Sequence, residues 1–162
     1  MGKVGPLAGL RVVESCGWSG AFAGRLLADA GADVLRVAPP EGDWLGAEPP
    51  FFGDSGVSIQ ATWYNAGKRV VSLDLGETPG REQFLSLIEN ADMVLEDWPA
   101  DSGPFSPEEI AGRNGAIVHV SITAMGEGGP WANLRTNDLV ANALSGAASV
   151  TGNVETPPIT GY

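Results

Sequence analysis

The chain has 162 residues, of which 43% are hydrophobic and 18% charged, a composition typical of a globular protein and not of a disordered one. Twenty acidic residues against nine basic ones give a net charge of −11. That balance argues against nucleic acid and anionic membranes as partners, because both require a concentrated basic surface. It is compatible with a phosphorylated small molecule, which needs only a few local cations.

The sequence contains one cysteine, Cys16, and no apolar run close to the ~20 residues that a membrane-spanning helix needs. A lone cysteine cannot form an internal disulfide, so the reducing cytoplasm is the expected location. Residues 1–15 lack the apolar core of a signal peptide. We therefore expect a cytoplasmic protein that spans one domain.

Short runs rich in β-branched and other apolar residues predict strands along the chain. Each run is nearly continuous in hydrophobicity, which is typical of strands covered on both faces. Helical patterns separate several of them, and strands that alternate with helices predict parallel βαβ units. The sequence thus predicts an α/β fold with a mostly parallel sheet. The predicted strands are residues 10–15, 32–37, 69–75, 91–97 and 116–122.

Three segments between these strands predict helices, over residues 20–31, 78–91 and 106–114. Their apolar residues recur at helical spacing and would form one buried stripe on each helix. The residues expected to face the core are Phe22, Leu26 and Leu27 in the first helix and Phe84, Leu87 and Ile88 in the second.

Residues 39–61 are dense in proline, glycine and aromatic residues and show no periodicity. Connections this long inside a compact domain are usually functional or mobile. We therefore expect residues 39–61 to form a long irregular loop of the predicted α/β domain.

The stretch "RTNDLVANALSGAASVTG" runs like an amphipathic helix that begins near Asp138, just after the glycine-rich segment "MGEGGP". An acid in a first helical turn is favoured by the positive end of the helix, so Asp138 can be read as an ordinary helix-start residue. It can also be read as a nucleophile, since a carboxylate is ionised at neutral pH and needs no general base. The residues alone leave both interpretations open.

Read in order, several motifs of the chain resemble the N-terminal portion of the class III CoA-transferases, the CaiB/BaiF-type family. The resemblance covers almost the whole chain, and its most specific parts are the third motif and the Gly-Pro loop followed by Asp. The motifs are "PLAGLRVVE" at 6–14, "GAFAGRLLADAGADVLRV" at 20–37, "NAGKRVVSLDL" at 65–75, "ADMVLED" at 91–97, "VSITAMGEGGP" at 120–130 and "NDLVANALSG" at 137–146.

In that family the aspartate at the position of Asp138 attacks an acyl-CoA thioester and forms a mixed anhydride. CoA thiolate converts the anhydride to an aspartyl-CoA thioester, and an incoming carboxylic acid finally takes over the CoA. The resemblance therefore implies a CoA-transferase in which coenzyme A enters as acyl-CoA and a small carboxylic acid is the second substrate.

Ligands of parallel sheets gather at the carboxyl ends of the strands, and an acidic protein needs local cations there to bind the phosphates of CoA. The family uses a basic residue after the second strand and a "KR" pair near the nucleotide. Each of these residues could equally be a surface charge, and Trp18 could simply pack on the sheet. The expected CoA-binding residues are Trp18, Ser19, Arg36, Lys68, Arg69, Asp97, Thr123, Ala124 and Met125.

Departures from the family pattern keep other functions open. Ala38 stands where the family has an acid, and "EDWPAD" replaces a motif that carries an arginine near CoA. The alternative function is a non-catalytic, degenerate half that binds CoA weakly or supports assembly. An acyl-CoA racemase is less favoured, because the histidine of that branch is missing from "PEEIAGRNGA".

Family members are longer than this chain, with a second domain and a C-terminal segment that returns to the Rossmann-like domain, and they interlock as dimers. The resemblance implies that residues 1–162 are the N-terminal part of the family's Rossmann-like three-layer domain, and that the second domain and the C-terminal return lie outside them. It also implies that a sheet edge is left unpaired, and that the chain forms a homodimer or pairs with a C-terminal half. No Cys/His cluster has the spacing of metal ligands, so no metal is expected.

Overall fold

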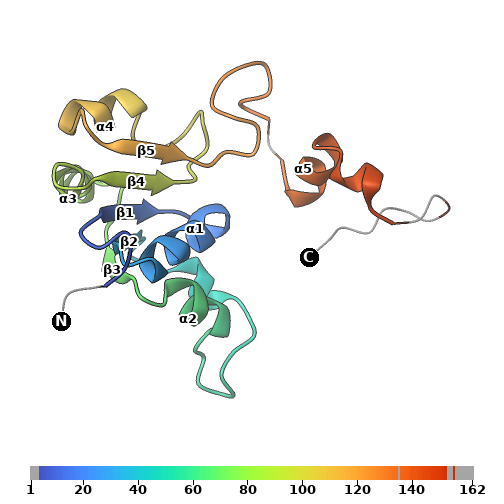
Figure 1. The fold of residues 1–162 in the computed structure, drawn as a ribbon, viewed down its shortest axis with the longest axis horizontal. Helices are drawn as coiled ribbons and strands as arrows, with labels where there is room; N and C mark the ends of the chain where they lie inside the picture. Colours follow the sequence, from blue (N-terminus) through green and yellow to red (C-terminus); the bar gives the residue numbers. More distant parts are fainter. Residues whose placement is uncertain (1–3, 135, 153–154, 156–162) are drawn as a thin grey trace. The chain divides into compact units, whose positions relative to one another are not determined.

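A computed structural model describes residues 4–134, 136–152 and 155 of the chain (Figure 1). It divides into two compact units, which we call the sheet unit (Met1–Trp98 and Ser102–Ile122) and the α5 unit (Pro99–Asp101 and Thr123–Tyr162). The strands are β1 Arg11–Ser15, β2 Asp33–Ala38, β3 Arg69–Ser72, β4 Met93–Glu96 and β5 Val118–Ser121. The helices are α1 Trp18–Asp29, η1 Trp44–Ala47, α2 Ile59–Asn65, α3 Thr78–Ile88, α4 Pro107–Arg113, α5 Asp138–Leu144 and η2 Ala147–Val150.

The five strands form one parallel sheet in the order β3-β2-β1-β4-β5. Val13 at the centre of β1 lies opposite Leu35 of β2 and Val94 of β4. The predicted α/β fold with a parallel sheet is confirmed. All five predicted strands are present: β2 is shifted by one residue, and the other four are shorter than predicted. The strand order reverses between β1 and β4, which is the place where open α/β sheets bind ligands.

Helices cover both faces of the sheet. Successive strand residues point to opposite sides, so neighbouring residues of β1 belong to different core clusters. Val13 belongs to the larger core cluster with Phe84 and Ile88 of α3 and Ile110 of α4. Val12 belongs to the smaller cluster on the other side, with Ala28 of α1 and Val34 of β2. The prediction that Phe84 and Ile88 are buried is confirmed, and Leu87 is half-buried against the same core.

Helix α1 packs on the sheet mainly through small residues, and of the apolar stripe that the sequence predicts only Leu27 packs, half-buried, against the core. Its buried residues are Gly20, Ala21, Gly24 and Ala28. Phe22 and Leu26, which were expected to face the core, are 48% and 53% exposed. That prediction was wrong because the helix lies too close to β1 for large side chains: a Cβ on Gly20 would lie 2.2 Å from Cys16 Sγ.

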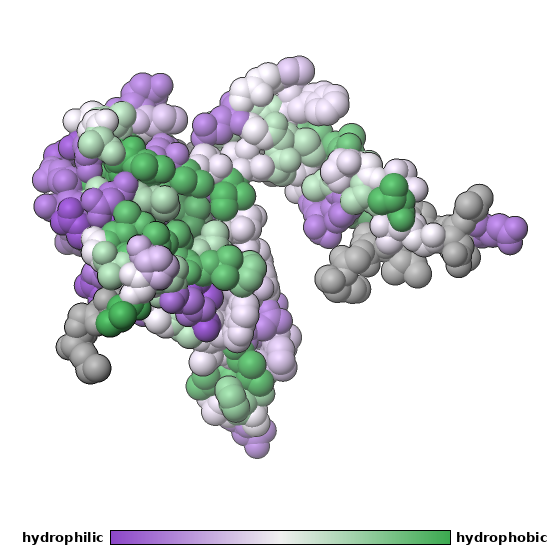
Figure 2. Space-filling model, in the orientation of Figure 1, coloured by the Kyte–Doolittle hydropathy of each residue, from purple (hydrophilic) through white to green (hydrophobic). Residues whose placement is uncertain are grey.

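The segment 39–61 is more ordered than the sequence indicated. It contains η1 and an isolated bridge between Phe51 and Ser58, and α2 begins at Ile59 with Ser58 as its N-cap. The sequence missed α2 because this seven-residue helix has no buried face that would produce a periodic apolar pattern. The loop between η1 and α2 exposes Phe51, Phe52 and Val57. Figure 2 shows a hydrophobic patch close to the end of this loop.

The two edge strands are more exposed than the central strands. Val70 of β3 and Val118 of β5 are 55% and 52% exposed, so coverage on both faces holds for the middle of the sheet and not for its edges. Among the described residues, no helix is long and apolar enough to cross a membrane.

Candidate functional site

Asp138 is the first residue of α5, and its side chain is exposed. The N-cap is the preceding residue, Asn137, whose Oδ1 accepts a hydrogen bond from the backbone N–H of Val140 at 3.0 Å. In the described part of the chain no donor contacts the Asp138 carboxylate, and only its backbone oxygen is engaged, by Asn142 Nδ2 at 3.0 Å. The helix is therefore capped by Asn137, which leaves the Asp138 carboxylate available for chemistry.

The glycine-rich segment before α5 has the backbone conformation that only glycine adopts readily. Gly126 and Gly129 have φ of 81° and 101°, in the left-handed region. Thr123, Ala124 and Met125, three of the expected CoA-binding residues, precede these glycines and belong to the same α5 unit as Asp138. Thr123 and Met125 are half-buried and Ala124 is exposed.

In the sheet unit, the residues that follow β1 and β4 meet at the point where the strand order reverses. The backbone N–H of Gly17 donates to both carboxylate oxygens of Asp97 at 2.8 Å. Trp98 Nε1 donates to Ser15 Oγ at 3.2 Å, which ties the ends of the two strands together. Because Asp97 already occupies the amino end of α1, a phosphate placed there would compete with a carboxylate, whereas a neutral amide would not.

Trp18 and Ser19 open α1 beside this point, and both are exposed. The Trp18 ring lies 5.1 Å from the ring of Trp44 and 5.7 Å from that of Tyr64, measured between centroids. The structure thus brings Trp18, Ser19 and Asp97 together around the turn between β1 and α1. It also adds Trp44, which the sequence did not single out, to the same neighbourhood.

Arg36 and Lys68, the two cations expected at the CoA phosphates, lie inside the protein on either side of Glu14. The exposed fractions of the three side chains are 2% for Arg36, 0% for Lys68 and 0% for Glu14. Arg36 Nη1 donates to Glu14 Oε1 at 2.6 Å, and Lys68 Nζ donates to the same oxygen at 2.8 Å. Burial raises the pKa of Glu14 and lowers the pKa of Lys68, and in each case the opposite charge of the partner counteracts the shift.

The same network fixes the segment that follows β2. Arg36 Nη2 donates to Asp43 Oδ1 at 3.0 Å, and Asn65 Nδ2 donates to Asp43 Oδ2 at 2.9 Å. Asp43 also caps η1 by accepting from the backbone N–H of Leu45. The sequence identified the cations and missed Glu14, Asp43 and Asn65, although an acid inside the apolar run "RVVES" was a visible signal.

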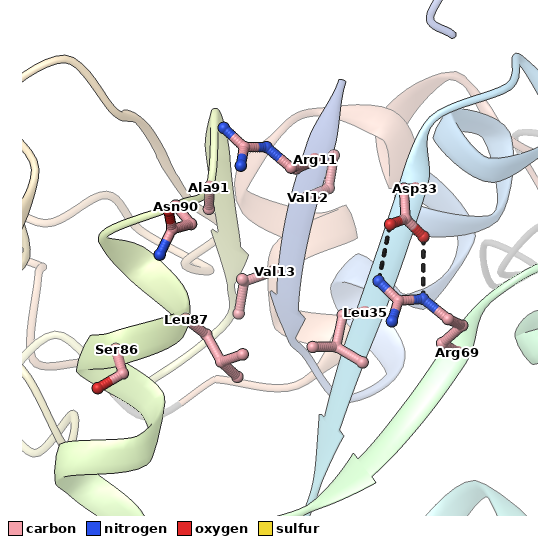
Figure 3. Close-up of a pocket in the computed structure, with 10 residues that line it drawn as sticks. All are labelled: Arg11, Val12, Val13, Asp33, Leu35, Arg69, Ser86, Leu87, Asn90 and Ala91. Carbon is pink, nitrogen blue, oxygen red and sulfur yellow. Dashed lines mark hydrogen bonds and ion pairs between the residues drawn. The ribbon is translucent and has the colours of Figure 1, made fainter. Parts of the chain in front are cut away.

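Arg69 lies at the amino ends of the strands, whereas the turn between β1 and α1 lies at their carboxyl ends. It makes a bidentate ion pair with Asp33, with Nη2 2.7 Å from Oδ2 and Nε 3.0 Å from Oδ1 (Figure 3). The pair borders a cavity of about 190 Å³ at the amino ends of β1 and β2, with Val13, Leu35 and Leu87 in its apolar wall. The structure therefore does not bring Arg69 together with Trp18, Ser19 and Asp97.

A second cavity, of about 310 Å³, lies at the carboxyl ends of β1, β2 and β3, where a ligand of this fold is expected. Ala38 lies in its wall, at the position where the sequence departs from the family's acid. The charged residues that line it, Glu41 and Asp74, are both acidic. The cavity offers room for part of a ligand at the carboxyl ends of the strands, but among the described residues no cation lines it.

Comparison with known proteins identifies the family to which the chain belongs. The model of CoA-transferase family III matches residues 7–161. The chain is 35% identical to the succinyl-CoA:mesaconate CoA-transferase of Haloarcula hispanica over 96% of this chain and 42% of that protein. It is 34% identical to the succinate–glutarate CoA-transferase of Agrobacterium fabrum over 95% of this chain and 41% of that protein.

Solved structures give the same result. A CaiB/BaiF family protein from Brucella suis superposes with a TM-score of 0.87 at 32% identity, covering 96% of this chain and 43% of that one. Rv3272 from Mycobacterium tuberculosis superposes with a TM-score of 0.81 at 29% identity, covering 97% of this chain and 45% of that one. The chain thus spans less than half the length of these relatives.

Proposed function

This chain belongs to CoA-transferase family III, and we propose that it contributes the nucleophile and part of the CoA-binding scaffold of an enzyme that moves CoA from an acyl-CoA thioester to a carboxylic acid. The names of its relatives support this reaction class. Because the chain covers 42% of the Haloarcula relative, the proposal concerns the intact protein in which these residues work.

The observation that carries the proposal is that Asn137, and not Asp138, caps α5. Asn137 performs the capping, so the carboxylate of Asp138 is not needed to start the helix. An exposed carboxylate that has no donor partner among the described residues suits a nucleophile that must approach a bulky thioester.

In the proposed reaction, one oxygen of the Asp138 carboxylate attacks the thioester carbonyl, and CoA thiolate leaves as the mixed anhydride forms. The thiolate then attacks the Asp138 carbonyl of the anhydride and releases the donor acid, which gives an aspartyl-CoA thioester. The acceptor carboxylate attacks this thioester and displaces the thiolate again. The thiolate finally attacks the acceptor carbonyl of the new anhydride, which yields the product acyl-CoA and restores the Asp138 carboxylate.

A carboxylate is a weak nucleophile toward a thioester, so the protein has to supply orientation. A well-positioned near-attack geometry can contribute roughly 7–11 kcal/mol to such a step. Backbone N–H groups that steady the developing oxyanion add about 3–4 kcal/mol each. The backbone around Gly126 and Gly129 can present such groups, because no side chain blocks access to it at those positions.

We propose that CoA lies along the carboxyl ends of the strands, with its neutral pantetheine part beside Trp18, Ser19 and Asp97. The carboxylate of Asp97 at the amino end of α1 favours a neutral group there. Thr123, Ala124 and Met125 remain proposed contacts from the α5 unit. Direct phosphate binding by Arg36, Lys68 or Arg69 would require each side chain to leave its ion pair with Glu14 or Asp33.

We also propose that the protein works as a homodimer, or with a C-terminal half as partner, in the cytoplasm. The exposed edge strands and the absence of buried residues in α5 support a need for further packing partners. The buried state of Arg36 and Lys68 favours a second candidate, a degenerate half that supports assembly without turnover. Titration with CoA separates the two, because the second candidate predicts weak binding or none.

The test is a transfer assay with succinyl-CoA as donor and small dicarboxylic acids as acceptors, in the intact protein. Asp138→Asn should lower kcat by about three orders of magnitude or more, since it removes the attacking oxygen anion. Asn137→Ser, which keeps a good N-cap, is the matched control and should retain activity. Undiminished turnover by Asp138→Asn would overturn the proposal.

A further inference from the structure

We infer that Lys68 is a positioning residue of the CoA site: it holds the first turn of α1, which presents Trp18 and Ser19, against the end of β1, and it does not contact the CoA phosphates. This inference rests on the proposed function, because it concerns how that function's ligand is bound. It assigns Lys68 a different role from the one that the sequence predicts.

The Lys68 ammonium makes two hydrogen bonds inside the protein and an ion pair with Glu14. Nζ donates to the backbone oxygen of Ala21 at 2.9 Å and to Glu14 Oε1 at 2.8 Å, and it lies 2.6 Å from Glu14 Oε2. The side chain is completely buried. A phosphate could be bound only if this ammonium gave up these partners, which would leave the buried Glu14 carboxylate with a single cation.

Lys68 reaches α1 at the place where that helix is closest to the sheet. A Cβ on Gly24 would lie 1.7 Å from Glu14 Oε2 and 3.0 Å from Lys68 Nζ, so only glycine fits there. A Cβ on Gly20, one turn earlier, would lie 2.2 Å from Cys16 Sγ just after β1. The start of α1 is therefore located by two close contacts with β1 and by the hydrogen bond from Lys68.

The second cation of the cluster has a different task. Arg36 contacts Glu14 and Asp43, and through Asp43 it holds the segment that carries η1 and Asn65. Lys68 shares Glu14 with Arg36 but bonds directly to α1 through the Ala21 carbonyl. Loss of Lys68 should therefore disturb the turn that carries Trp18 and Ser19 more than loss of a surface cation such as Arg69.

The experiment compares two ligands, CoA and pantetheine, in titrations of the intact protein followed by NMR. Pantetheine lacks every phosphate of CoA, so a direct phosphate contact would affect only CoA. Positioning predicts that Lys68→Met weakens both ligands by the same factor, roughly tenfold, the size of one charge-assisted hydrogen bond. Arg69→Met, which removes the neighbouring exposed cation, should change both affinities by less than about twofold.

A double variant, Glu14→Gln with Lys68→Met, removes one charge of each sign and keeps the test valid where Lys68→Met fails to fold. It should again weaken both ligands equally, because the bond to the Ala21 carbonyl is still missing. Weaker CoA binding with unchanged pantetheine binding would overturn the inference in favour of a phosphate contact. Unchanged affinity for both ligands would also overturn the inference, since Lys68 would then be only part of a buried ion pair. A wild-type protein that binds neither ligand would overturn the proposed CoA site itself.

Discussion

The sheet unit and the α5 unit differ in how much of each is buried. In the sheet unit, Val34, Phe84, Val94 and Ile110 are completely buried, and both faces of the central strands are covered by helices. In the α5 unit, neither α5 nor η2 contains a buried residue. The ligand scaffold is thus fixed by its own core, whereas the proposed nucleophile lies on a helix without one.

This difference indicates how the site is assembled. A helix of seven residues is shorter than the ~12–15 residues that isolated helices need to be even marginally stable, so α5 depends on its cap and on packing against other polypeptide. Trp18, Ser19 and Asp97 need no such help, because the hydrogen bond from Gly17 to Asp97 and the buried Glu14 cluster hold their backbone in place. We expect mutations to separate the two regions clearly.

The largest effect is expected from removal of a core ring. Phe84→Ala should lower the free energy of unfolding by about 3–5 kcal/mol, because it leaves a cavity in the larger core cluster. Leu139→Ala, on the exposed side of α5, should change it by less than about 0.5 kcal/mol. Urea denaturation of the two variants measures the contrast, and equal losses would show that the α5 unit has a core of its own.

A smaller effect is expected where α1 meets β1. Gly24→Ala places a methyl group against the buried Glu14 carboxylate and should destabilise the sheet unit by about 1–3 kcal/mol. Gly112→Ala in α4 is the matched control, since a Cβ there meets nothing within 4 Å. It should stabilise the protein by about 0.5–1 kcal/mol through helix propensity. Thermal unfolding compares them, and a harmless Gly24→Ala would contradict the close packing.

The cap of α5 provides a local test of the other region. Asn137→Ala should destabilise this helix by about 1 kcal/mol and leave the sheet unit unchanged. Amide hydrogen exchange reports the two regions separately, so faster exchange should be confined to residues 138–144. Faster exchange in β1 or α3 as well would show that the two regions unfold together.

The smallest expected effect is on the pH dependence of stability, through Asp92 at the amino ends of the strands. A hydrogen bond from the backbone N–H of Arg11 lowers the pKa of Asp92 below its ordinary value of 3.8. The stability that this carboxylate contributes is complete above the unfolded value and is lost as the pH falls through the lower folded value. Asp92→Asn should therefore flatten the stability profile slightly below about pH 4. An unchanged acid limb would contradict the assignment.

The sequence predicted the sheet well because each strand is a short apolar run between helical patterns, and those signals are local. It failed for α1, where Gly20 and Gly24 face β1 and the large residues Phe22 and Leu26 face outward, because periodicity shows which residues share a face and not which face is covered. It also missed α2, which has no buried face.

For the candidate site, the sequence predicted where some residues lie along the elements, but not the contacts of its charged side chains. The position of Asp138 at the start of a helix and the left-handed glycines before it follow from local sequence. The partners of Lys68 do not, since Glu14 lies 54 residues away in the chain and meets Lys68 only through the strand order of the sheet. Because of this non-local ion pair, Lys68 is buried against Glu14, whereas the sequence predicted that it contacts the ligand.

The most direct test of the account is to trap the activated carboxyl group of Asp138. The intact protein is mixed with acyl-CoA and hydroxylamine, digested, and the peptide that contains Asp138 is analysed by mass spectrometry. The account predicts a hydroxamate at Asp138 that appears only with acyl-CoA, as expected when an anhydride or thioester forms on that carboxylate. An unmodified Asp138 in a preparation with measured transfer activity would contradict it.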